Sequence, residues 1–295
     1  EAAELEGYQL LPYQTEPFVM NVKGASAAGK STIRPLQREL ASRLGVRWED
    51  FALVSPDYWR KYMLDYDSLG NQFKYAAMLT GQELEIIDKK LDGYMAQKAK
   101  RGQMPHLLID RFRFDSFESS GTEKTDERLL SRFGHTVFMF FIITPPTETV
   151  ERAWKRGQIT GRYKAVDDLL FHNVEAYSGM PQLFLKWVNK YKQKVHFEFL
   201  DNDVPHGNRP KTVAFGWNGK ITILDPDCIR RLSSYRKINV DAMRPEDVYQ
   251  EASDKDEDLL QTFVKRKLNI TFLDSLSLKI NAQIRDGKCI FETEG

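Results

Sequence analysis

Short apolar runs alternate with amphipathic segments along much of the chain. The apolar runs are rich in β-branched and aromatic side chains, which predicts buried strands at residues 18–22, 48–55, 106–110, 136–143 and 196–200. Apolar residues at helical spacing predict helices over residues 33–44, 82–100 and 166–177, and shorter helices that begin at Pro56, near Thr147 and at Pro181. This alternation predicts a three-layer α/β fold, in which helices cover both faces of a parallel sheet. The almost wholly apolar run 136–143 suits the centre of such a sheet.

The pattern changes after residue 200. Residues 212–215 and 220–224 flank Asn218-Gly219, a pair that favours a tight β-hairpin. Asp225-Pro226 is expected to cap a short helix. Residues 240–295 are first acidic and then basic, and their pattern leaves the fold open. We therefore divide the chain into a lead-in at 1–17, a core domain at 18–235 and a small C-terminal appendage at 236–295.

Composition narrows the functional classes. The formal net charge of +1 implies no general attraction to nucleic acid, so a nucleic-acid partner is not expected. The 2 cysteines, Cys228 and Cys289, form neither a disulfide framework nor a metal pattern. No membrane-spanning run and no signal peptide are visible, which favours a cytoplasmic location and is compatible with delivery into another cell. Because the chain begins at Glu1 instead of a methionine, we expect it to be a piece of a longer product.

The strongest chemical signal is the glycine loop that follows the first predicted strand. Its sequence matches the P-loop (Walker A) pattern, G-x-x-x-x-G-K-[ST], and lies between a strand and a helix, as that motif requires. In such a loop the backbone N–H groups converge on phosphate oxygens, the lysine reaches the β- and γ-phosphates and the hydroxyl binds Mg²⁺. The sequence therefore predicts binding of ATP and Mg²⁺, with Lys30 and Ser31 in these two roles. The predicted nucleotide-binding residues are Gly24, Ala25, Ser26, Ala27, Ala28, Gly29, Lys30, Ser31 and Thr32.

A carboxylate after the second predicted strand is a candidate general base. Asp57 is expected near the carboxyl edge of the sheet, where ligands bind in such folds, and could take a proton from an acceptor hydroxyl. Alternatively, Asp57 only stabilises the first turn of its helix through the helix dipole. Arg60, one turn further on, could pair with Asp57 or bind substrate.

A second candidate group follows the third predicted strand. Asp110 ends that strand and could belong to the Mg²⁺ shell, orient the substrate, or simply be solvated. Arg111 and Arg113 follow it in an extended segment and would suit a small anionic substrate, because arginine binds phosphate oxygens through two hydrogen bonds.

A cationic cluster occupies a predicted helix end and the loop after it. Its members are Arg152, Lys155, Arg156, Arg162 and Lys164. The helix dipole accounts for Lys155 and Arg156 without any function, but it does not account for the basic loop at 160–164. We interpret that loop as a lid that closes on ATP and brings arginines to the γ-phosphate.

Together, these residues resemble the zeta toxin family of P-loop kinases. Besides the P-loop, the turn at 55–60 and the lid, the segments 171–177, 199–202, 210–214 and 218–220 are similar to that family, and the likeness spans about residues 15–235. Members transfer the γ-phosphate of ATP to a hydroxyl of a UDP-activated amino sugar. The resemblance implies that Asp57 is the base and that Arg152 and Arg162 are the charge-stabilising arginines. The resemblance is also compatible with a neutralising protein partner.

The chain departs from the zeta toxin pattern at two places. Residues 110–115 stand where many members of the family carry a glycine- and threonine-rich turn on the substrate side. The spacing from Arg152 to Arg162 is compact for a lid, so Arg156 could replace either arginine.

The first guess for the function is a phosphotransferase that acts on a UDP-amino sugar. The rivals are a kinase that acts on a nucleic-acid end or a protein hydroxyl, and an ATP-dependent switch with little turnover.

Overall fold

The computed structural model describes residues 5–75, 80–110, 130–161, 163–189, 192–250 and 258–293. Within these ranges, no helix is long and apolar enough to cross a membrane.

A ten-stranded sheet organises the molecule, in the order β10-β9-β8-β7-β6-β5-β4-β1-β3-β2. The first five strands along the chain pair with one another in parallel, which confirms the predicted parallel core. The strands are β1 (Phe18–Lys23), β2 (Phe51–Val54), β3 (His106–Ile109), β4 (Thr136–Ile143), β5 (Lys194–Asp201), β6 (Lys211–Trp217), β7 (Lys220–Ile223), β8 (Asn269–Leu273), β9 (Ile280–Arg285) and β10 (Lys288–Glu292).

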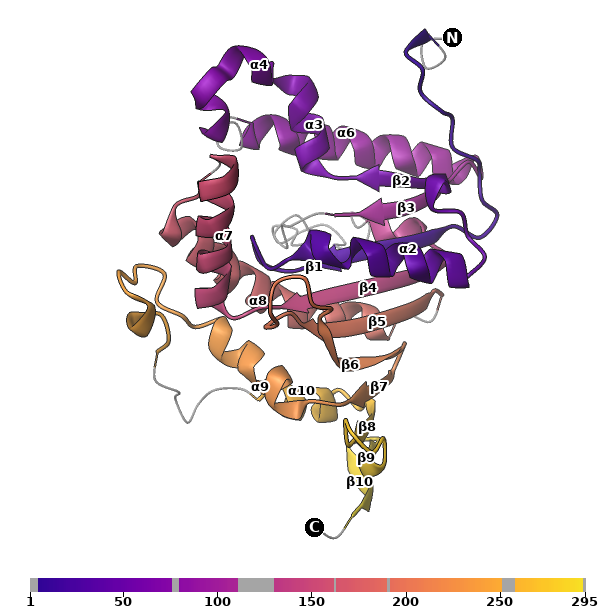
Figure 1. Cartoon of the computed structure of the whole chain (residues 1–295). Helices are drawn as coiled ribbons and strands as arrows, with labels where there is room; N and C mark the ends of the chain where they lie inside the picture. Colours follow the sequence, from indigo (N-terminus) through magenta and orange to yellow (C-terminus); the bar gives the residue numbers. More distant parts are fainter. Residues whose placement is uncertain are drawn as a thin grey trace.

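Helices cover both faces of this sheet, so the three-layer α/β prediction is also confirmed. In Figure 1, α2 lies in front of the sheet and α8 behind it. The α-helices are α2 (Arg34–Arg43), α3 (Pro56–Met63), α4 (Tyr66–Leu69), α6 (Gly81–Lys100), α7 (Pro146–Thr160), α8 (Val166–Val188), α9 (Pro226–Tyr235) and α10 (Leu259–Lys265). Short 3₁₀ helices are η1 (Lys30–Ile33), η2 (Trp48–Asp50), η3 (Gly70–Tyr75), η6 (Leu130–Phe133) and η7 (Pro245–Asp247).

The core is centred on β4, in which every residue is buried. The ring of Phe141 stacks on Phe199 of β5 at a centroid distance of 4.7 Å, and Phe184 of α8 meets Phe199 edge-on at 5.2 Å. Offset and edge-on aromatic pairs add to the free energy gained by burying apolar area. These contacts fix α8 against the sheet and thereby fix the helix that follows the lid segment.

Three local predictions were wrong. Residues 48–50 form the 3₁₀ helix η2 instead of the start of a strand. Helix α7 begins at Pro146, whose ring presets a helical φ, so Thr147 is not its cap. Pro181 does not open a new helix but lies inside α8. Proline removes one backbone hydrogen bond from a helix, and here apolar burial on both sides of Pro181 keeps the helix continuous.

The C-terminal residues extend the same sheet. The hairpin predicted at Asn218-Gly219 joins β6 to β7, and β8 then pairs with β7 in parallel. Phe263 of α10 and Ile270 of β8 are buried in the main core. Strands β8–β10 therefore continue the central sheet at the end opposite β2 (Figure 1). The division of the chain at residue 235 stays a prediction.

Candidate functional site

The candidate site lies where the strand order of the sheet reverses. Strand β1 pairs with β3 on one side and with β4 on the other, and the glycine loop at 24–29 leaves its carboxyl end. In open α/β sheets, ligands bind in the crevice at such a switch point. The predicted strand–loop–helix context of the P-loop is present, with the 3₁₀ helix η1 inserted before α2.

Backbone geometry explains why small residues occupy the loop. Gly29 has a φ of 93°, a left-handed conformation that glycine adopts without strain. A Cβ on Gly29 would also collide with Nδ2 of Asn202. Lys30 turns back over the loop, and its Nζ donates hydrogen bonds to the carbonyl oxygens of Gly24 at 3.1 Å and Ala25 at 2.9 Å. The ammonium group therefore lies against two carbonyl groups at the start of the loop.

A buried hydrogen-bond network holds the loop on the sheet. The carbonyl oxygen of Ala28 accepts from Oγ1 of Thr144 at 2.9 Å and from Nδ2 of Asn202 at 2.8 Å. The backbone N–H of Thr144 in turn donates to the hydroxyl of Tyr177 on α8 at 2.8 Å. Burial raises the pKa of Tyr177, which keeps this hydroxyl protonated. The Ala28 carbonyl group thus joins the loop to the ends of β4 and β5, and Thr144 joins this network to α8.

These positioning residues were missed by the sequence-based assignment of the site. Thr144 and Asn202 each directly follow a strand, and Asn202 lies in a segment that resembles the zeta toxin family. Their position at strand ends was the available signal, because the carboxyl ends of parallel strands converge on the site.

Oxygen ligands suitable for Mg²⁺ lie at the start of the helix and at the end of β3. Ser31 is exposed in η1. Arg34, one turn further on, pairs with Asp110 through Nη2 and Oδ2 at 3.1 Å. Hydroxyl and carboxylate oxygens are the donors that Mg²⁺ prefers. The two predicted metal-binding residues therefore suit the ion chemically, and Arg34 is an additional partner of Asp110 that the sequence-based assignment did not include.

Several predicted residues fall outside what the structure describes. Arg111, Arg113 and Arg162 lie outside the described residues, as does the side chain of Asp57, whose backbone is in the first turn of α3. Arg60, also on α3, donates from Nε to Oγ1 of Thr80 at 3.1 Å. The catalytic and substrate-binding roles assigned to these residues stay predictions.

Arg152 connects α7 to the strand ends of the site. Its Nε donates to Oε1 of Glu148 at 2.9 Å, and its Nη2 donates to the carbonyl oxygen of Asn202 at 2.8 Å. The guanidinium therefore contacts the backbone of the same Asn202 whose side chain holds the P-loop. Its role as a charge-stabilising arginine also stays a prediction.

The start of the predicted lid packs back on α7. Gly157 is buried, and a Cβ there would collide with the ring of Tyr163. The ring centroids of Tyr163 and Trp154 are 5.3 Å apart. These contacts hold Tyr163, and with it the neighbouring Lys164, close to the helix. The pKa of Lys164 is lowered to about 8, chiefly by burial, with the opposing effect of Asp168 and the like charges of Arg156 and Lys30 included.

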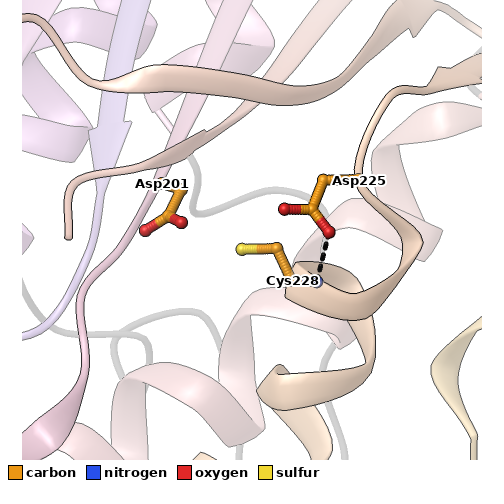
Figure 2. A group of neighbouring side chains, drawn as sticks. All are labelled: Asp201, Asp225 and Cys228. Carbon is orange, nitrogen blue, oxygen red and sulfur yellow. Dashed lines mark hydrogen bonds between the residues drawn. The ribbon is translucent and has the colours of Figure 1, made fainter. Parts of the chain in front are cut away.

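A second polar cluster lies between the end of β5 and the start of α9 (Figure 2). In the part of the chain that the structure describes, ligand atoms of Asp201, Asp225 and Cys228 lie within 4.8 Å of one another. Asp225 caps α9 by accepting a hydrogen bond from the N–H of Cys228 at 2.9 Å. Nη2 of Arg231 lies 3.5 Å from Oδ2 of Asp201. Burial raises the pKa of Cys228 to about 12, so the thiol stays protonated. Helix capping and the arginine account for this cluster.

Comparison with known proteins identifies solved structures with a similar fold. No protein-family model and no curated protein sequence matches the chain. The crystal structure of the AvrRxo1-ORF1:AvrRxo1-ORF2 complex with sulphate ions contains a similar chain, with a TM-score of 0.54 and 14% identity over 90% of this chain and 73% of that chain. The crystal structure of the same complex with ATP gives a TM-score of 0.54 and 14% identity, over 86% and 72% of the two chains. A chain of the PezAT chromosomal toxin–antitoxin system of Streptococcus pneumoniae gives a TM-score of 0.41 and 16% identity, over 87% and 88%.

The chain therefore shares its α/β fold with a chain of the AvrRxo1-ORF1:AvrRxo1-ORF2 complex. At these identities, the similarity to solved structures establishes the fold alone.

Proposed function

We propose that this protein is an ATP- and Mg²⁺-dependent phosphotransferase that moves the γ-phosphate to a hydroxyl of a small anionic acceptor. The observation that carries the proposal is the P-loop at the switch point of the sheet, with Lys30 beside the loop carbonyls and Gly29 in the conformation that the motif requires. A similar chain belongs to a complex whose crystal structure contains ATP, which supports the choice of nucleotide.

Each residue has a defined part in this proposal. The N–H groups of the loop and Lys30 bind the β- and γ-phosphates, and Ser31 and Asp110 supply oxygen ligands for Mg²⁺, which neutralises phosphate charge when it is bound. Asp57 accepts the proton of the acceptor hydroxyl, and Arg152 and Arg162 stabilise the charge that develops during transfer. Arg60, Arg111 and Arg113 bind the anionic part of the acceptor.

The first candidate acceptor is a UDP-amino sugar, because the resemblance to zeta toxins implies that class.

A neutralising protein partner is part of the same proposal. The AvrRxo1 structures are of a complex of two components, ORF1 and ORF2, which supports a search for a partner. The protein is expected to act in the cytoplasm, where ATP is abundant.

The test is phosphate transfer from ATP in the presence of Mg²⁺ to UDP-amino sugars, nucleosides and oligonucleotides, with mass spectrometry of each acceptor. We expect a phosphorylated small anionic acceptor with the wild-type protein, and at least a hundredfold lower rate with Lys30→Ala. Asp57→Asn should bind ATP but transfer no phosphate, because it removes only the base.

The other outcomes distinguish the rival functions. Transfer to oligonucleotides or proteins alone would indicate a macromolecular acceptor, and ATP binding without any transfer would indicate a switch. Full activity in the Lys30→Ala protein would contradict the proposed role of the P-loop.

A further inference from the structure

We propose that Arg34 and Mg²⁺ compete for the carboxylate of Asp110, so that Arg34 leaves this carboxylate when the metal binds with ATP. This inference rests on the proposed function, which assigns Asp110 to the metal and gives Arg34 no part. The hydrogen bonds that fix the two residues, and the ion pair that joins them, carry the inference.

Arg34 is held next to the residue that the P-loop motif assigns to the metal. Its backbone N–H donates to the carbonyl oxygen of Ser31 and so closes the 3₁₀ turn η1. Side chains three residues apart in a 3₁₀ turn eclipse one another. The side chains of Ser31 and Arg34 therefore leave the same side of this turn.

Asp110 is fixed at the edge of the sheet on the other side of the site. Its backbone N–H donates to the carbonyl oxygen of Val54 at 3.0 Å, so the residue continues the pairing of β3 with β2. Strand β3 also pairs with β1, from which the glycine loop leaves. The sheet therefore places the backbone of Asp110 beside the loop independently of the contact with Arg34.

The guanidinium of Arg34 joins these two elements. Its Nη2 lies 3.1 Å from Oδ2 of Asp110, and 29% of the Arg34 side chain and 21% of the Asp110 side chain are exposed. An ion pair that is partly open to solvent is screened, so it contributes little to stability and is readily exchanged. Arg34 thus extends from the turn that carries Ser31 to Asp110, and these are the two residues with oxygen ligands suitable for the metal.

A guanidinium and a metal ion cannot use the same carboxylate equally well. Both are cations, and they repel each other where solvent is partly excluded. Mg²⁺ carries twice the charge of the guanidinium and demands close oxygen ligands in octahedral geometry. Arg34 should consequently give up Asp110 when the metal binds. When ATP binds without the metal, Arg34 should stay on Asp110 and prevent the carboxylate from repelling the phosphates.

The ATP affinity measured with Mg²⁺ and with EDTA tests this competition. In Arg34→Gln, ATP in EDTA should bind more weakly, because the charge of Asp110 is no longer compensated. ATP with Mg²⁺ should bind at least as tightly as in the wild type, because the competitor of the metal has been removed. We expect the ratio of the Kd in EDTA to the Kd with Mg²⁺ to rise about threefold to fivefold, as suits a partly exposed ion pair. Isothermal titration calorimetry measures both constants.

A double-mutant cycle isolates the carboxylate. Arg34→Gln should not raise the ratio when it is added to Asp110→Asn, because the carboxylate for which the two cations compete is then absent. Two single variants are matched controls. Arg43→Gln breaks an exposed ion pair with Glu39 on the same helix, and Lys194→Met removes an exposed charge at the start of β5. Both should keep the wild-type ratio.

The outcomes separate this inference from the proposed function. Thermal unfolding identifies any variant that fails to fold, and Arg34→Met, with the same expected ratio, replaces Arg34→Gln if that variant does. An unchanged ratio in Arg34→Gln, or an equal rise in the Asp110→Asn background, would overturn the inference alone. Wild-type affinities that are equal with Mg²⁺ and with EDTA would contradict the proposed metal site, and no binding of ATP at all would contradict the proposed function.

Discussion

At the scale of single residues, the phosphate loop depends on side chains outside its own motif. The carbonyl oxygen of Ala28 accepts from two buried donors, Thr144 and Asn202, and Asn202 also occupies the space that a side chain on Gly29 would need. Buried hydrogen bonds of this kind fix a single loop conformation, because an unmade bond leaves a polar group without compensation. The conformation of the loop is therefore specified partly from β4 and β5.

Substitution of Asn202 tests this dependence. In Asn202→Ala, Ala28 loses one of its two donors and Gly29 gains space, so the loop should sample more conformations. We expect the free energy of unfolding to fall by about 1–2 kcal/mol and ATP affinity to fall about tenfold. Denaturant unfolding and calorimetric titration measure the two effects. Asn208→Ala, at an exposed turn, is the matched control. An Asn202→Ala protein with wild-type affinity would show that the loop needs no support from β5.

At the scale of elements, β5 joins the parallel and antiparallel parts of the sheet. It pairs in parallel with β4 and antiparallel with β6. On one face, His196 lies between Phe138 and Trp217, with ring centroids 5.7 Å and 4.9 Å away. Burial lowers the pKa of His196 to about 4, despite a hydrogen bond with the backbone of Gly216. The imidazole is therefore neutral in the folded protein at neutral pH.

This position predicts a pH dependence of stability. In the unfolded chain His196 titrates near its ordinary pKa of about 6.5, so between about pH 6.5 and 4 the unfolded state binds more protons than the folded state. Stability should consequently fall as the pH falls through this window, by at most about 3 kcal/mol from His196. The lowered pKa of buried His106 adds to the effect in the same direction. Denaturant unfolding between pH 4 and 7 measures the dependence.

Variants identify the histidine responsible. His196→Phe keeps an aromatic ring between Phe138 and Trp217 and should flatten the decline below pH 6.5. His206→Gln, at an exposed position, should leave the decline as in the wild-type protein. An unchanged pH dependence in His196→Phe would contradict the assignment.

Elements with strong local signals could be predicted from the sequence. The P-loop, the apolar run of β4 and the hairpin at Asn218-Gly219 all follow from residue types within a short segment. Other features depend on distant contacts. Pro181 would end an isolated helix, but α8 continues because both sides of it are buried in the core. The contact of Asn202 with Ala28 joins residues far apart in the chain, and no local pattern contains it.

At the scale of the whole molecule, one sheet carries both the site and the C-terminal residues. The sequence did not predict that β8 would pair with β7, because residues 240–295 lack a clear alternation of apolar and polar positions. Strand order also determines the site: the reversal at β1 brings together the ends of β3, β4 and β5, and with them Asp110, Thr144 and Asn202. The fold therefore concentrates polar groups around one loop, and the central claim is that this loop binds the phosphates of ATP.

Equilibrium titration of ATP with Mg²⁺ into the wild-type and Lys30→Ala proteins tests that claim most directly. The Lys30 ammonium is expected to bind phosphate oxygens, and a hydrogen bond between charged groups contributes about 1.5–3 kcal/mol. We therefore predict that the wild-type protein binds ATP and that Lys30→Ala binds it at least tenfold more weakly, whereas Lys194→Met binds it as the wild type does. Equal affinity in the wild-type and Lys30→Ala proteins, or no binding to either, would contradict the account.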